Sequence, residues 1–176
     1  CSAMLVTSAM KRGDFDEATF HLQKSATYFE LTGHFRSLSA VYHNLGSTAG
    51  MRGELEEACT WHQKQLRIAE LLGDIVPLSE ALFGLGMAEY KMGNVLQAHE
   101  YLQEALQLSE QADHTYNIFI QKESLIPVYL DLGKQQEARD ALSTMISSGA
   151  TLDAVYFHAR CITAAMRIAS SSEEWE

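Results

Sequence analysis

The feature that most constrains this chain is an internal repeat with a period of 40 residues. Glycines recur on this period, together with alanines five residues after them and leucines eight residues before them. These positions are Gly13, Gly53, Gly93 and Gly133, then Ala18, Ala58, Ala98 and Ala138, then Leu5, Leu45, Leu85 and Leu125. Such regularity indicates repeated copies of one supersecondary unit. Because one unit cannot bury its own apolar face, the units must stack on each other.

Within each period the pattern predicts two helices joined by short turns. Gly53 follows a helical run, and glycine tolerates the positive φ angle that closes a helix. Glu56 and Glu57 place negative charge on the first turn of the next helix, which suits the helix dipole. From Leu55 to Ala69, apolar and small residues then recur at helical spacing. We expect helices near residues 2–11, 14–31, 35–51, 54–72, 75–91, 94–111, 115–131, 134–147 and 152–170.

Small side chains at matching positions favour close packing between these helices. A methyl group at each aligned alanine lets two helix backbones approach, whereas a larger side chain would force them apart. The chain has only two prolines among its 176 residues, which is also compatible with a largely helical structure. We therefore expect an all-α superhelical solenoid of antiparallel helix pairs, with about nine helices.

The repeat also predicts how the chain is divided. We expect residues 1–147 to form the repeats, residues 148–170 a C-terminal capping helix, and residues 171–176 an acidic tail. Residue 1 aligns with residue 41, so the first unit is truncated and upstream sequence is expected to be missing. A truncated unit would expose an apolar edge. Self-association through this N-terminal unit is therefore one expectation.

Composition narrows the classes of partner. The chain has 13 basic and 23 acidic side chains and a net charge of −10, which disfavours nucleic acid and anionic membranes. No apolar stretch reaches the ~18 residues typical of a membrane-spanning helix. The three cysteines are too few and too scattered for a disulfide framework, which favours a reducing compartment. We expect a cytoplasmic protein that attracts basic partners.

Several repeated motifs carry a family resemblance. The residues Leu45-Gly46, Gly53-Glu54 and Ala58 recur as Leu85-Gly86, Gly93-Asn94 and Ala98, and this pattern resembles the tetratricopeptide repeat family. The period is longer than the usual ~34 residues of the family. The stretch from Trp61-His62 to Leu85-Gly86 resembles the long-repeat subtype, which includes partner-of-inscuteable-type adaptors, kinesin light chains and sensor regions of bacterial regulators. The resemblance implies a right-handed superhelix whose first helices line a concave groove.

The resemblance also implies which residues contact a partner. The family's groove positions map here to His43, Asn44, Ser47, Glu80, Phe83, Met87, Tyr90, Glu123 and Leu130. This mixture of apolar, aromatic and acidic side chains suits a protein or peptide segment that carries apolar and basic residues. The alternative for each position is that the side chain belongs to the core. For Asn44 the alternative is a local hydrogen bond rather than a contact to a ligand's backbone.

Catalytic and metal-binding signatures are not found in the sequence. It contains no phosphate-binding loop, and its seven histidines form no H-E-x-x-H pattern. Cys59 and His62 lie on the packing stripe, so core positions are favoured over a nucleophile and its base. We expect no enzyme activity, no cofactor and no metal site. The leading hypothesis is a non-catalytic protein-protein interaction module. The alternative is a ligand-sensing regulatory domain of a larger, possibly bacterial, transcriptional or signalling protein.

Overall fold

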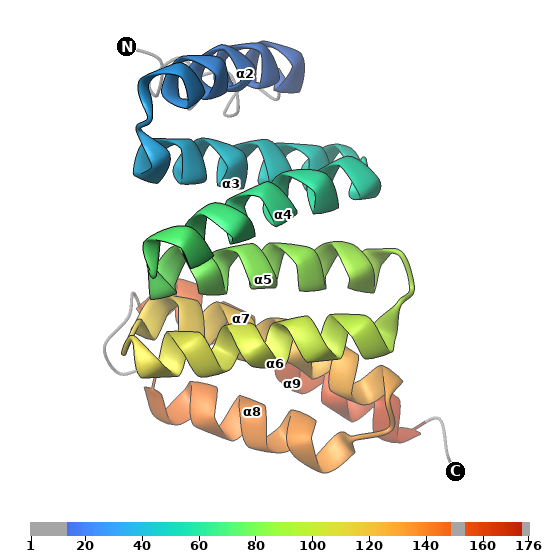
Figure 1. The fold of residues 1–176 in the computed structure, drawn as a ribbon. Coiled ribbons are helices and arrows are strands. Elements are labelled where there is room, and N and C mark those ends of the chain that lie inside the picture. The colour runs from blue at the N-terminus through green and yellow to red at the C-terminus, as the bar shows by residue number, and fades with distance from the viewer. Residues whose placement is uncertain (1–13, 149–153, 174–176) are drawn as a thin grey trace.

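The fold, seen in a computed structural model, is described for residues 14–148 and 154–173. Within these ranges the chain forms eight helices and no strand (Figure 1). The helices are α2 (Phe15–Thr32), α3 (Phe35–Arg52), α4 (Leu55–Leu72), α5 (Ile75–Lys91), α6 (Val95–Gln111), α7 (Thr115–Asp131), α8 (Gln135–Ser148) and α9 (Ala154–Glu173). The all-α prediction is confirmed. The helix expected at residues 2–11, and the edge expected to self-associate, lie outside the described residues.

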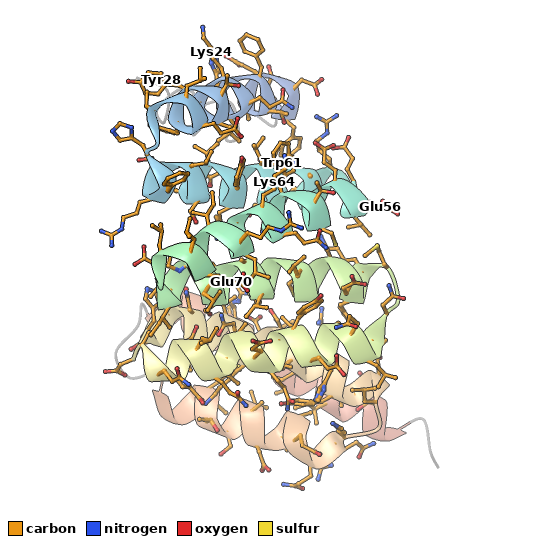
Figure 2. The ribbon with its side chains drawn as sticks, in the orientation of Figure 1. Lys24, Tyr28, Glu56, Trp61, Lys64 and Glu70 are labelled. Atoms are coloured by element: carbon orange, nitrogen blue, oxygen red, sulfur yellow. The ribbon has the colours of Figure 1, made fainter. Side chains whose placement is uncertain are left out.

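The predicted helix boundaries agree closely with the structure. Each of the eight described helices begins and ends within three residues of its predicted position. The largest difference is at the C-terminus, where α9 continues to Glu173, into the segment predicted to be an acidic tail. From α2 to α8, successive helices are joined by two or three residues, so each reverses direction relative to the one before. In Figure 1 the helix pairs stack in chain order as a solenoid, and Figure 2 shows side chains between the successive helices in the same orientation.

The aligned small residues lie where the repeat predicted them, between packed helices. Ala18, Ala58, Ala98 and Ala138 are at most 1% exposed. The aligned leucines Leu45, Leu85 and Leu125 are also buried. The repeat in the sequence is therefore a repeat of packing positions, with the same residue type buried at the same place in successive units.

At one helix end the repeated glycine is replaced by another residue, yet the backbone keeps the left-handed conformation. Gly33 and Gly73 end α2 and α4 with φ angles of 68° and 66°. At the matching position of the next unit the sequence has Asp113, whose φ angle is also positive, at 50°. No other non-glycine residue in the described ranges has a positive φ. Aspartate visits this left-handed region more readily than most residues with a side chain, so the turn survives the loss of its glycine.

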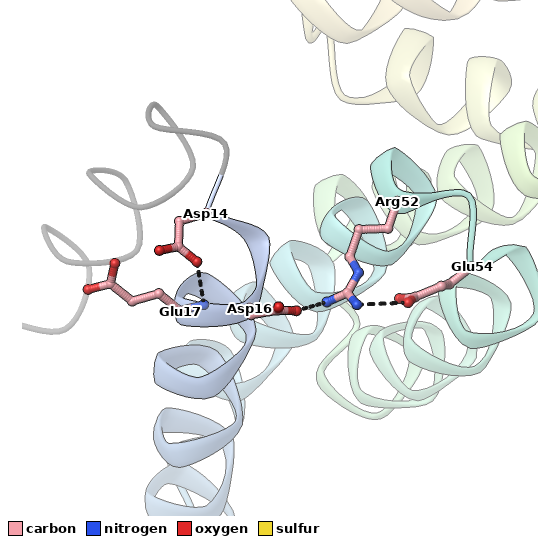
Figure 3. A network of polar contacts seen from close by, with 5 residues as sticks. All are labelled: Asp14, Asp16, Glu17, Arg52 and Glu54. Carbon is pink, nitrogen blue, oxygen red and sulfur yellow. Dashed lines mark hydrogen bonds and ion pairs between the residues drawn. The ribbon is translucent and has the colours of Figure 1, made fainter.

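Polar contacts connect the first described helix to the next unit. The Asp14 carboxylate accepts a hydrogen bond from the backbone N–H of Glu17 at 3.1 Å, which caps the start of α2. The Arg52 guanidinium contacts Asp16 at 2.7 Å and Glu54 at 3.0 Å (Figure 3). Arg52 therefore links the start of α2 to the turn between α3 and α4. Because these side chains are partly exposed, we expect the pairs to contribute to register more than to stability.

The core consists of two large apolar clusters joined by a more polar centre. The N-terminal cluster is formed by Leu22, Ala26, Leu38, Val41, Tyr42 and Leu45. The C-terminal cluster includes Leu102, Phe119, Leu125, Ile126, Val128, Tyr129, Ala138 and Met145 from α6 to α8, and Cys161, Ala164 and Ile168 from α9. The buried polar residues of the centre include Thr48, His62, Gln65, Ser79 and Ser109. The helix α9 thus contributes Cys161, Ala164 and Ile168 to the C-terminal cluster, and its role as a capping helix stays a prediction.

Candidate functional site

The first helices of successive units form the inner side of the solenoid. The helix α3 contacts α5, and α5 contacts α7, whereas α4 and α6 make no direct contact within the described part of the chain. A stack in which only one row of helices is in contact must curve toward that row. The groove predicted on α3, α5 and α7 therefore lies on the concave side.

Two adjoining cavities open on this inner side. The α3–α5 cavity has a volume of about 260 Å³, and the α5–α7 cavity has a volume of about 190 Å³. His43, Glu80 and Phe83 line both cavities, so the two adjoin at these side chains and together make up the groove. The α3–α5 cavity is further lined by Gly46, Ser47, Gly50, Met51, Leu55, Ala58, His62, Gly84, Met87, Ala88 and Lys91. The α5–α7 cavity is further lined by Tyr116, Asn117, Ile120 and Gln121.

His62 of α4 lies in a notch between two glycines. A Cβ atom added to Gly46 of α3 would lie 2.6 Å from the ring, and one added to Gly84 of α5 would lie 2.4 Å from it. Neither distance is compatible with an alanine unless the ring moves. The two glycines therefore allow a buried imidazole to reach the wall of the α3–α5 cavity.

The hydrogen bonds of His62 determine its tautomer. Gln65 Nε2 donates to the carbonyl oxygen of Pro77, so Gln65 Oε1 is the atom that faces His62. That oxygen can only accept, and His62 Nδ1 therefore carries the proton, at 3.2 Å. Burial lowers the pKa of His62, the hydrogen bond to Gln65 opposes this, and the neighbouring His43 adds a smaller lowering, so that the pKa lies at about 4. At neutral pH the cavity wall thus presents an uncharged imidazole.

Five of the nine predicted partner-binding residues line the groove. They are His43, Ser47, Glu80, Phe83 and Met87. All five are partly buried, which is compatible with contact to a ligand and with support of the groove wall. Glu80 lines both cavities and forms no ion pair within the described part of the chain. It is therefore the carboxylate that remains available to a basic partner.

The other four predicted residues do not line either cavity. The Tyr90 hydroxyl donates to Asp131 Oδ2 at 2.8 Å, and burial and this bond raise the pKa of Tyr90 to about 12. Glu123 forms an ion pair with Arg160 of α9. Leu130 packs against the C-terminal cluster.

Asn44 is partly buried next to the groove, and its backbone carbonyl accepts a hydrogen bond from Thr48. Whether these four side chains contact a partner stays a prediction.

The structure adds groove residues that the sequence reasoning did not select. Among them are His62, Lys91, Tyr116, Asn117 and Gln121. One of them carried a signal in the repeat. Gln121 occupies the position of the apolar Val41 and Ala81 in the preceding units, and a polar residue at a buried position of the period marks a special site.

Two kinds of feature, a metal site and a membrane-spanning helix, are absent from the described ranges. No group of three or more His, Cys, Asp or Glu residues there has the arrangement of a metal site. None of the described helices has the length and apolar character needed to cross a membrane.

Known proteins resemble this chain in part of its sequence and in its fold. Residues 37–111 match the family described as Tetratricopeptide repeat. A search of curated proteins gave no match. Among solved structures, BtubC from P. vanneervenii is similar, with a TM-score of 0.70, 18% identity, and coverage of 99% of this chain and 81% of that chain.

Two further solved structures are similar over most of the described helices. A kinesin light chain with nearly identical TPR-like repeats from Podosopora anserina has a TM-score of 0.71 and 18% identity. The match covers 98% of the present chain and 89% of the kinesin light chain. A Rap protein in complex with competence and sporulation factor has a TM-score of 0.64 and 12% identity. The match covers 89% of the present chain and 60% of the Rap protein. At these identities the likeness concerns the fold.

Proposed function

We propose that the chain, whose residues 37–111 match the tetratricopeptide repeat family, uses its concave groove to bind a peptide or helical segment of a partner protein. The fold is that of a protein-interaction module in general. The finer proposal concerns where the partner binds and what chemistry it carries.

The observation that carries the proposal is the groove made up of the two adjoining cavities. Five residues expected to contact a partner line it, from two successive first helices, α3 and α5. Phe83 and Met87 supply apolar and deformable surface, which suits an apolar anchor of the ligand. A pair of adjoining cavities on a curved inner surface is more suited to a chain segment than to one compact small molecule.

Charge favours a partner that also carries basic residues. The chain has a net charge of −10, and Glu80 lies where the two cavities meet. A basic segment is attracted over distance by the overall charge and is then positioned by local charges. The other predicted carboxylate, Glu123, has a cationic partner within the chain in Arg160. We therefore assign the basic contact of the ligand to Glu80 rather than to Glu123.

Two accompanying proposals concern activity and location. We propose that the chain is not an enzyme, because the groove combines apolar contacts with a single carboxylate in an arrangement suited to recognition. We also propose a cytoplasmic location. The described cysteines, Cys59 and Cys161, are free thiols, which is compatible with a reducing compartment.

The groove assignment is tested by selecting ligands and then removing the groove surface. Random dodecapeptides displayed on phage would be selected on the wild-type protein, and the selected peptides would be titrated by calorimetry. Phe83→Ala should weaken their binding at least tenfold, because an apolar anchor loses its contact area. The matched control is Leu96→Ala, which removes an apolar side chain that is 72% exposed on α6 and lines neither cavity.

The outcome that would overturn the proposal is a selected peptide whose affinity is unchanged by Phe83→Ala. Weakening by Leu96→Ala instead would place the binding surface on α6, outside the groove. Circular dichroism of both variants would show that the helices are retained.

A further inference from the structure

Three residues that line the α5–α7 cavity carry polar atoms whose bonding capacity is not used within the described part of the chain. Gln121 Oε1, Asn117 Nδ2 and His43 Nδ1 are all buried, and none of the three has a hydrogen-bond partner there. The three residues come from α7 and α3, and all line this cavity. Because a buried polar atom without a partner costs free energy, such atoms at one cavity mark a built polar surface.

The orientation of Gln121 follows from the hydrogen bonds behind it. Gln121 is 2% exposed, and its Nε2 lies 2.8 Å from Ser79 Oγ. The Ser79 hydroxyl also lies 2.9 Å from the carbonyl oxygen of Ala105, which can only accept. Ser79 Oγ also lies 2.6 Å from Ser109 Oγ. The single proton of Ser79 therefore goes to Ala105 or Ser109, and the Gln121 atom facing Ser79 must be a donor. This leaves the carbonyl oxygen, Oε1, as the Gln121 atom free to accept a hydrogen bond from a ligand.

The three atoms define which ligand groups fit. Gln121 Oε1 accepts and Asn117 Nδ2 donates, while His43 Nδ1 takes either role according to its tautomer. A carboxamide offers both an N–H donor and a carbonyl acceptor a short distance apart, so it satisfies Gln121 Oε1 and also the Asn117 amide, whichever end of that amide faces the ligand. A guanidinium or ammonium group has no acceptor for Asn117. A carboxylate has no donor for Gln121, and Glu80 at the same cavity would repel it.

The size and walls of the cavity suit the same group. Its volume of about 190 Å³ accommodates the end of one side chain. Phe83 and Tyr116 also line it, so the stem of a ligand side chain has apolar surface to contact while its polar end reaches Gln121. Because the cavity adjoins the α3–α5 cavity through Phe83, a peptide with an apolar anchor in one has a neighbouring side chain within reach of the other.

From this geometry we infer that the α5–α7 cavity is a specificity subsite for a carboxamide, the side chain of an asparagine or glutamine in the bound peptide. The inference rests on the proposed function, since it names one side chain of the ligand that the groove holds.

The first experiment asks what the groove selects. Peptides obtained by phage display on the wild-type protein should share an Asn or Gln at a constant spacing from their apolar residue. In the tightest peptide, replacing that residue by the isosteric acid, Gln→Glu or Asn→Asp, should weaken binding by at least tenfold. Replacing it by norleucine should also weaken binding, because Gln121 and Asn117 then stay without partners.

The second experiment inverts the chemistry of the cavity. Asn117→Asp turns the donor into an acceptor of nearly the same shape. Asp is also compatible with this place in the first turn of α7, where negative charge suits the helix dipole. The variant should bind the carboxamide peptide at least tenfold more weakly, and should prefer the same peptide with Arg or Lys in its place. The matched control is Asn94→Asp, which adds the same charge at the exposed N-cap of α6, lines neither cavity, and should leave the preference for a carboxamide unchanged.

The results separate the subsite from the groove. If selected peptides lose affinity in Phe83→Ala but carry no preferred Asn or Gln, the groove binds peptides and the carboxamide subsite is wrong. Selection of arginine at that position by the wild-type protein would also overturn the subsite, in favour of a guanidinium site. If Phe83→Ala has no effect on any selected peptide, the proposal that peptides bind in the groove is wrong, and the carboxamide subsite is then wrong as well.

Discussion

At the scale of single residues, His62 shows how a polar side chain comes to be buried in a repeat core. The two glycines that flank its ring provide space. Gln65 Oε1 accepts a hydrogen bond from the single N–H group of the neutral imidazole. In the next unit the position of His62 is taken by Leu102, which is fully buried against Gly86. The same notch therefore accepts an imidazole in one unit and an isobutyl group in the next.

The lowered pKa of His62 predicts how stability depends on pH. In the unfolded chain an ordinary histidine binds a proton near pH 6.5, whereas the folded protein binds it only near pH 4. Between these values the unfolded state holds more protons, so the free energy of unfolding falls as the pH is lowered. A shift of this size corresponds to a loss of about 2 kcal/mol between pH 7 and pH 5.

The variant His62→Leu, which copies the residue of the next unit, should remove this contribution. Urea denaturation of both proteins at pH 7, 6 and 5 would measure the free energy of unfolding. We expect the decline toward pH 5 to be smaller in the variant by about 2 kcal/mol. An equal decline in both proteins would show that His62 is not held neutral by the fold.

At the scale of helices, the contact between paired helices depends on which position carries a small residue. Gly46 and Gly86 face His62 and Leu102 across their helix pairs. In the following unit Ile126 stands at the glycine position and is fully buried, and the opposing Leu142 is only partly buried. A larger residue on α7 is thus accompanied by a partner on α8 that is displaced toward solvent. The units share one plan but differ in how closely their helices approach.

Two glycines one turn apart on α3 allow a matched test of this contact. A Cβ at position 46 would lie 2.6 Å from His62, whereas one at position 50 would lie 3.9 Å from Ala58. Gly46→Ala should therefore destabilise the protein by about 1–3 kcal/mol, because the buried ring must move. Gly50→Ala should be neutral or stabilising by up to about 1 kcal/mol, since alanine favours a helix more than glycine does.

Chemical denaturation of the two alanine variants measures both effects on one scale. Equal stability of Gly46→Ala and Gly50→Ala would mean that α3 and α4 adjust without strain, and that the close approach does not depend on glycine at position 46.

At the scale of the whole molecule, stability is expected to be distributed along the solenoid. Each helix contacts its neighbours in the stack, and the two large apolar clusters lie toward opposite ends, with buried polar groups between them. In such a structure the free energy is approximately a sum over units and their interfaces. A local defect should therefore loosen its own end of the stack more than the other.

Two buried leucines at the same repeat position test this expectation. Leu45 lies in the N-terminal cluster and Leu125 in the C-terminal cluster, and both are at most 2% exposed. Replacing either by alanine should cost about 2–5 kcal/mol. Amide hydrogen exchange should accelerate mainly in α2 to α4 for Leu45→Ala, and mainly in α7 to α9 for Leu125→Ala. Uniform acceleration over all helices in both variants would instead indicate a single cooperative unit.

Much of the fold was determined by the sequence itself. The repeat positions, the helix boundaries and the burial of the aligned alanines and leucines follow from periodicity along the chain, and all agree with the structure in its described part. These features are local or repeated, so a single sequence shows the same pattern of helix ends and buried positions several times. The row of helices that lines the groove was also predicted, because the resemblance assigns that row in every unit.

The chemistry of the groove was decided by the tertiary structure. Tyr90 bonds to Asp131, Glu123 pairs with Arg160, and Gln121 is oriented by Ser79, each across about 40 residues of sequence. Periodicity places each of these residues on a helix face, but the bonding of its polar atoms depends on which side chain of another unit lies opposite. That pairing arises only when the units stack, because side-chain hydrogen bonds require contact within about 3 Å.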